Sequence, residues 1–184
     1  MHRDIKPENI LLKDTEQTLR LCDFGFARSM PNKTSSEMTD YVATRWYRSP
    51  ELLLKMAYGR PADLWAVGCI MGEMTDGEAL FDGDSDIDQL FKIQNVQGIL
   101  PEEHLEEFSR NPRYLGYKFP EISSPETLEK RYIGKLSKKA LSLMSGLLDL
   151  RPEARLTAIQ ALSHSYFDGI RDEEMETYLE SKRK

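Results

Sequence analysis

The spacing of three polar motifs near the start of the chain constrains its fold more than any other feature. His2-Arg3-Asp4 is followed by Asn9, five residues after Asp4, and Asp23-Phe24-Gly25 begins fourteen residues after Asn9. Apolar residues on both sides of a polar stretch in the intervening segment predict a β-hairpin. The hairpin would join two short loops that carry a carboxylate, an amide and a second carboxylate.

The predicted hairpin pairs residues 10–12 with residues 18–22 across the polar turn 13–17. Leu19 and Leu21 alternate with polar neighbours, so we expect both side chains to face inward.

The remainder of the chain has mostly helical patterns. Ser49 and Pro50 suit the cap and the first turn of a helix, and residues 62–75 are apolar on nearly all sides, which predicts a buried helix. Leucines recur at helical spacing over residues 136–148, and Thr157 with Gln160 predicts a capping box. One hairpin among many helices predicts a mainly α (α+β) domain.

Composition narrows the possible settings and partners. A length of 184 residues with 40% hydrophobic content suits one domain, and the net charge of −6 disfavours nucleic acid or an anionic membrane as partner. Cys22 and Cys69 form no paired motif, so we expect reduced thiols and a cytoplasmic or nuclear protein. No apolar run approaches the ~18 residues of a membrane span.

The polar motifs fit the chemistry of phosphoryl transfer from a nucleotide. Asp4 can accept a hydroxyl proton, and Lys6 can place a positive charge near the transferred group. Asn9 and Asp23 offer the oxygen ligands that Mg²⁺ prefers. Taken singly, each of these residues is more simply explained as a solvated loop residue, whereas the whole set at this spacing favours a nucleotide site.

A longer motif gives the family resemblance. It is the run Tyr41-Val42-Ala43-Thr44-Arg45-Trp46-Tyr47-Arg48-Ser49-Pro50-Glu51. With the polar motifs, it resembles the C-terminal lobe of eukaryotic Ser/Thr protein kinases, in the group of the cyclin-dependent and mitogen-activated kinases. Asp23-Phe24-Gly25-Phe26-Ala27-Arg28, Thr39-Asp40-Tyr41 and residues 83–90 and 111–120 are similar to the cyclin-dependent kinase-like family.

The resemblance implies a domain layout for the chain. A kinase lobe would cover residues 1–167, with its catalytic loop at 2–9, its activation segment at 23–51 and a group-specific insert at about 82–120. A charged tail would follow at 168–184. The acidic start of the insert, Asp82–Asp88, is either a protein docking surface or a solvated turn.

The resemblance also implies roles for residues outside the polar motifs. Thr44 would lie beside Asp4 and help to fix the loop that binds a protein substrate. Asp63 would anchor the backbone of His2-Arg3-Asp4, unless it is an ordinary helix N-terminal charge. Glu51 would pair with Arg155 inside the lobe, the alternative being a weak surface pair.

Regulation is implied by the same resemblance. Phosphate on Thr39, added by an upstream kinase, would recruit Arg3 and Arg28 and order the loop. Phosphate on Tyr41 would recruit Arg45 and Arg48. The alternative is an exposed loop that tolerates substitution and has no regulatory role.

We expect His104 to lie on a helix surface.

The sequence lacks three elements with which kinases of this family bind ATP. These are the glycine-rich loop, the lysine on a strand that contacts the phosphates, and the glutamate that pairs with this lysine, so half of an ATP site is missing. We therefore expect a catalytic-lobe fragment that, alone, binds Mg·ATP weakly and is inactive. The alternative is a naturally truncated pseudokinase-like module that binds protein partners.

Overall fold

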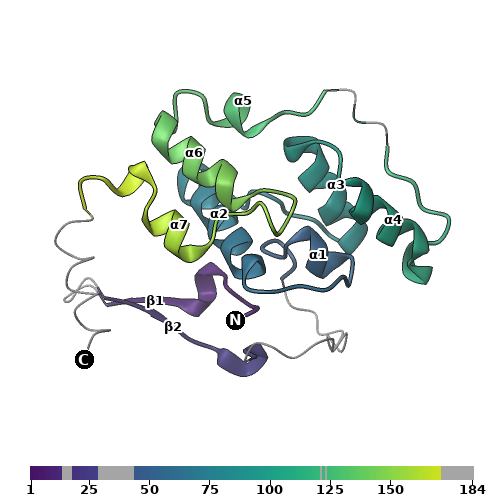
Figure 1. Ribbon diagram of the computed structural model, residues 1–184, viewed down its shortest axis with the longest axis horizontal. Helices are drawn as coiled ribbons and strands as arrows, with labels where there is room; N and C mark the ends of the chain where they lie inside the picture. The colour runs from purple at the N-terminus through teal and green to yellow at the C-terminus, as the bar shows by residue number, and fades with distance from the viewer. Residues whose placement is uncertain (14–17, 29–43, 121, 123, 171–184) are drawn as a thin grey trace.

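A computed structural model describes residues 1–13, 18–28, 44–120, 122 and 124–170. It shows a mainly α fold with one antiparallel hairpin, as predicted (Figure 1). The strands are β1 (Ile10–Lys13) and β2 (Thr18–Leu21), and the α-helices are α1 (Pro50–Leu53), α2 (Pro61–Asp76), α3 (Asp86–Gln97), α4 (Glu102–Arg110), α5 (Leu128–Tyr132), α6 (Lys138–Leu147) and α7 (Ala158–Leu162). The 3₁₀ turns found among these residues are η1 (Pro7–Asn9), η2 (Phe24–Phe26), η3 (Pro112–Tyr114) and η4 (Ser165–Phe167).

The hairpin forms where it was predicted, but its leucines are exposed. Ile10 pairs with Leu21 and Lys13 with Thr18. Leu19 and Leu21 are 56% and 39% exposed, so the inward orientation predicted for them is wrong. The physical reason is that the described helices pack on one another, and their core includes no residue of either strand (Figure 1).

Helix α2 lies at the centre of the helical part and packs against α6. Trp65 is fully buried, and Gly68 allows close approach, because a Cβ there would come within 2.7 Å of the Leu148 side chain. The prediction of burial on nearly all sides was wrong on one face. Val67 is 40% exposed and Met74 is 82% exposed.

Local signals at helix ends were read correctly, with one difference. Thr157 and Gln160 form the predicted capping box of α7. Pro50 stands in the first turn of α1 and Ser49 at its N-cap, but the Ser49 hydroxyl makes no capping hydrogen bond.

No helix among the described residues is long and apolar enough to span a membrane. Both cysteines are free thiols.

A buried ion pair joins two distant parts of the chain. Arg155 donates from Nη1 to Glu51 Oε1 at 2.8 Å and from Nη2 to Glu51 Oε2 at 3.1 Å, so the predicted pair is present in a two-point geometry. Arg155 also donates to the carbonyls of Asp149 and Pro61. Its guanidinium carbon lies 5.1 Å from the centre of the Trp65 ring. The charge of Arg155 is therefore fully compensated inside the core.

Removing one partner should leave an uncompensated buried charge. We expect Glu51→Gln or Arg155→Met to lower the free energy of unfolding by about 3–5 kcal/mol, measured by urea denaturation. Arg151→Gln is a matched control, since it breaks the exposed pair with Glu103 and should cost under about 1 kcal/mol. A loss as small as the control's in both core variants would contradict this role.

His104 lies on α4 and is only 2% exposed, so its predicted surface position was wrong. Its Nδ1 has no hydrogen-bond partner among the described residues. Burial lowers the pKa of His104 below its usual 6.5, and this effect outweighs the opposite influence of Glu51 and Glu103. The folded chain therefore favours the neutral imidazole.

This burial predicts a pH dependence of stability. Because the unfolded chain binds the His104 proton more readily than the folded chain, stability should fall as the pH decreases through 6.5 towards the lower folded pKa. The His104→Gln variant should lose this part of the slope, even if it is less stable at pH 7.5. Thermal unfolding of both proteins between pH 5.5 and 7.5 measures the difference, and parallel curves would contradict it.

Candidate active site

The loop that carries His2, Arg3 and Asp4 is fixed to the central helix. Asp63, in the first turn of α2, accepts hydrogen bonds from the backbone N–H of His2 at 2.7 Å and of Arg3 at 2.8 Å. One carboxylate thus binds two consecutive amides, which is the predicted contact. The loop takes its position from α2, whose Trp65 and Cys69 are fully buried.

Two residues in or beside this loop have a strained backbone. Arg3 has a φ of 74° and Asp23 a φ of 58°, in the left-handed region that side chains disfavour. The Arg3 side chain donates to the Phe26 carbonyl and, at 2.8 Å, to the Tyr58 hydroxyl. Strain of this kind persists where surrounding contacts enforce it, and it is common at functional sites.

Asp4, Lys6 and Asn9 converge on one point. Lys6 Nζ lies 2.9 Å from Asp4 Oδ2, and Asn9 Nδ2 donates to the same oxygen at 3.0 Å. Asn9 Nδ2 also donates to the Asp4 carbonyl at 2.8 Å. Asp4 Oδ1 has no donor among the described residues, so it is the atom placed to accept a proton. The Asn9 amide donates through its nitrogen, which leaves its oxygen for a cation.

Asp23 is linked to this cluster only by a backbone hydrogen bond of its neighbour Cys22, among the described residues. The Cys22 N–H donates to the Asn9 carbonyl at 3.0 Å, and the Asp23 carboxylate accepts from the Gly25 N–H at 3.3 Å. The His2 ring lies between the two loops. Its Nε2 bonds the Cys22 carbonyl at 3.0 Å and it packs against Phe24 with 4.8 Å between ring centres. No described contact joins the Asp23 carboxylate to Asn9 or Asp4.

The donor atoms suit a magnesium ion shared with phosphates. The described residues contain no cluster of three or more His, Cys, Asp or Glu side chains able to hold a metal alone. Asn9 and Asp23 supply two oxygen donors on adjacent loops. Magnesium is usually held by one or two protein oxygens together with phosphate oxygens and water, so this small donor set fits.

Thr44 and Arg48 border the same loop. Both line a narrow crevice with Arg3, Asp4 and Asp63. The role of Thr44 beside Asp4 stays a prediction. Burial lowers the pKa of Arg48, an effect that Asp86 partly offsets. The segment 44–48 therefore forms one wall beside the Asp4 carboxylate.

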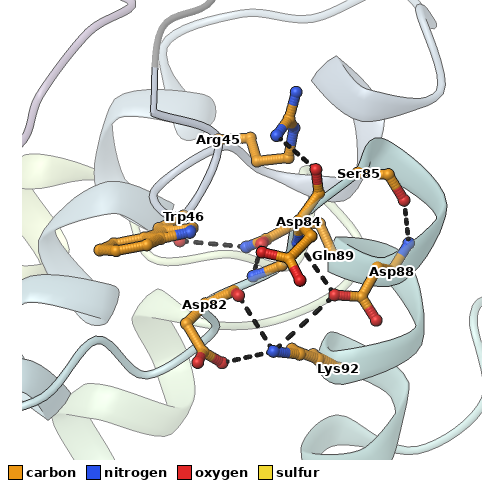
Figure 2. A network of polar contacts seen from close by, with 9 residues as sticks. Arg45, Trp46, Asp82, Asp84, Ser85, Asp88, Gln89 and Lys92 are labelled. Carbon is orange, nitrogen blue, oxygen red and sulfur yellow. Dashed lines mark hydrogen bonds and ion pairs between the residues drawn. The ribbon is translucent and has the colours of Figure 1, made fainter.

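Figure 2 shows how this wall is held against α3. Arg45 donates to Asp86 Oδ1 at 3.2 Å and to the Asp84 carbonyl at 2.9 Å. Gln89, which is fully buried, donates to the Trp46 carbonyl at 3.1 Å and accepts from the Gly83 N–H at 2.8 Å. The acidic segment 82–88 and the start of α3 are thus tied to the 44–48 wall by Arg45 and Gln89.

Lys92 engages two further acids of this segment. Lys92 binds Asp82 Oδ1 at 2.7 Å and lies 3.7 Å from Asp88 Oδ2. The Lys92 hydrogen bond lowers the pKa of the Asp82 carboxyl. Ser85 caps α3 by accepting from the Asp88 N–H.

The predicted phosphorylation sites, Thr39 and Tyr41, lie outside the described residues. Of the four arginines expected to bind phosphate there, Arg28 is exposed, while Arg3 and Arg45 already have partners. Arg48 is half-buried, and at Arg3 and Arg45 a phosphate would compete with the contacts that these side chains already make.

Two contributing residues were missed by sequence reasoning. Gln89 could have been found, because it is a polar residue on the apolar face that Leu90 and Ile93 share. Tyr58, which binds Arg3, has no local pattern that points to it, since the contact spans 55 residues.

The comparison with protein families agrees with this geometry. The family described as "Protein kinase domain" matches residues 1–167. The chain belongs to the protein kinase family.

Among curated proteins, this kinase chain is similar to the cyclin-dependent kinase-like proteins. It is 50% identical to mouse "Cyclin-dependent kinase-like 5" over its whole length, which is 20% of that protein. It is 48% identical to human "Cyclin-dependent kinase-like 2" over 91% of the chain and 34% of the relative. It is 42% identical to mouse "Cyclin-dependent kinase-like 4" over 99% of the chain and 52% of the relative. The chain therefore spans between a fifth and about half of these relatives.

The Asp63 contacts can be tested without any activity. Asp63→Asn leaves one good acceptor for two N–H groups, so amide exchange at His2 and Arg3 should become roughly tenfold faster or more. Hydrogen–deuterium exchange of the N-terminal peptide measures this. Asp149→Asn is the matched control, because Asp149 also accepts a backbone N–H, that of Arg151, at 2.9 Å. Equal exchange in both variants would show that Asp63 does not hold the loop.

Proposed function

We propose that this chain is the catalytic lobe of a protein serine/threonine kinase, which transfers the γ-phosphate of ATP to hydroxyls of protein substrates. The observation that carries the proposal is the convergence of Lys6 and Asn9 on one oxygen of Asp4. This arrangement leaves the other Asp4 oxygen available at the wall formed by residues 44–48.

In this proposal Asp4 orients the substrate hydroxyl and accepts its proton as the oxygen bonds to phosphorus and the bond to the leaving ADP breaks. Asn9 holds the Asp4 carboxylate in position through its side-chain amide. Lys6 forms an ion pair with Asp4 and would place its positive charge near the transferred group. Thr44 and Arg48 border the approach of the protein substrate.

Asn9 and Asp23 are the residues proposed to hold magnesium with the nucleotide phosphates. When bound, the metal neutralises charge on the phosphates. The backbone bond between Cys22 and Asn9 sets the spacing of the two loops. Asp23 is kept in its left-handed conformation by the following turn, where it accepts from Gly25.

Control by phosphorylation is part of the proposal. An upstream kinase would modify Thr39 and Tyr41, and the phosphates would draw on Arg3, Arg28, Arg45 and Arg48. Serine and threonine are the proposed acceptors because Lys6 stands two residues after Asp4, as in the kinases that this chain resembles.

Activity is best tested in a full-length setting. The chain replaces the matching 184-residue segment of mouse cyclin-dependent kinase-like 5, and labelling of Ser, Thr and Tyr peptide pools from γ-labelled ATP is measured. We expect labelling of Ser and Thr pools, and a loss of roughly 100- to 10,000-fold in kcat for Asp4→Asn.

Glu129→Gln, which alters an exposed carboxylate on α5, is the control and should be fully active. If the chimera unfolds as cooperatively as its parent but labels no pool, the catalytic proposal fails. A partner-binding module is then the better interpretation.

A further inference from the structure

A second pocket lies away from the candidate active site. It has a cavity volume of about 410 Å³ and lies between the end of α1 and the α4–η3 corner. Its lining residues are Leu54, Lys55, Glu107, Arg110, Asn111, Pro112 and Arg113. Three of these seven residues are cationic and one is acidic, although the whole chain has a net charge of −6. The pocket is therefore a local basic region on an acidic protein.

Lys55 occupies a backbone position that favours glycine. The Met56 N–H donates to the Glu51 carbonyl at 2.9 Å and the Lys55 N–H to the Leu52 carbonyl at 3.2 Å, which is the Schellman ending of a helix. In that motif the residue after the C-cap is left-handed and is usually glycine, and Lys55 has a φ of 61°. The strained backbone places a half-buried lysine side chain in the pocket lining.

Lys55 and Arg110 can accept a new acidic partner. The structure records no ion pair between Lys55 and any described carboxylate. Arg110 is paired with Glu106 at 2.9 Å and Glu107 at 3.3 Å, but its side chain is 67% exposed. Exposed pairs of this kind are weak, so an incoming carboxylate can compete for the guanidinium.

We infer that this pocket binds an acidic segment of a protein partner, with Lys55 and Arg110 as the residues that recognise its carboxylates. The occupant follows from charge complementarity, since the pocket is basic and is large enough for more than one side chain. Leu54 and Pro112 provide apolar walls for the stems of the acidic side chains. The inference does not depend on catalysis.

Peptide binding tests this directly. The probe is a fluorescein-labelled octapeptide of alternating glutamate and serine, titrated with the 184-residue chain and followed by anisotropy at low and high salt. A matched peptide of alternating glutamine and serine is the reference. We expect binding of the glutamate peptide only, and salt should weaken it by screening the attraction between its carboxylates and the cations of the pocket.

Variants locate the site. Lys55→Gly and Arg110→Gln should each weaken binding of the glutamate peptide by about three- to tenfold. Lys55→Gly should also raise the midpoint temperature of unfolding, because glycine accepts the left-handed backbone without strain. A more stable protein that binds less tightly separates recognition from folding. Lys55→Asn, which also tolerates this conformation, should reproduce the loss of binding.

Lys130→Gln, an exposed cation on α5, is the charge control and should bind like the parent chain. Equal binding of the two peptides overturns the inference. It is also overturned if the Lys55 and Arg110 variants bind as tightly as Lys130→Gln.

Discussion

The two hydrogen bonds between Asp63 and the backbone of His2 and Arg3 are the constraint on which the site depends. They transfer the rigidity of the packed helix α2 to a loop that has no regular structure of its own. Because the carboxylate accepts from consecutive amides, it fixes both position and direction of the chain there. Arg3 is held in a left-handed conformation as a result, and Asp4 follows at a defined angle.

The start of α2 also holds the 44–48 side of the site, through the buried ion pair of Arg155 and Glu51. Arg155 binds Glu51 and also the Pro61 carbonyl in the first turn of α2, so residues after the 44–48 wall are tied to the start of the central helix. Gln89 and Arg45 attach that wall to α3. The loop that carries Asp4 and the wall are therefore positioned by separate polar contacts to α2 and α3, while apolar packing supplies the frame.

Sequence reasoning succeeded where the determinants are local or where a family pattern specifies a distant pair. The hairpin, the capping box at Thr157 and the Glu51–Arg155 pair are of these kinds. It failed for Leu19, Val67 and His104, whose exposure depends on which elements pack against them. Periodicity identifies a helix or strand but not its neighbours. For the candidate site, the grouping of Asp4, Lys6 and Asn9 was predictable, whereas the Tyr58 contact to Arg3 was not.

The partners of Arg3 suggest how phosphorylation would act on this fold. In the structure Arg3 donates to a carbonyl and a hydroxyl, both uncharged acceptors. A phosphate carries about two negative charges and three acceptor oxygens, so it is the stronger partner for a guanidinium. Exchange of the Tyr58 hydroxyl for a phosphate would leave the Asp63 contacts to the Arg3 backbone intact. The arginine side chain could thus change partners while the position of Asp4 is preserved, which separates control of the site from its geometry.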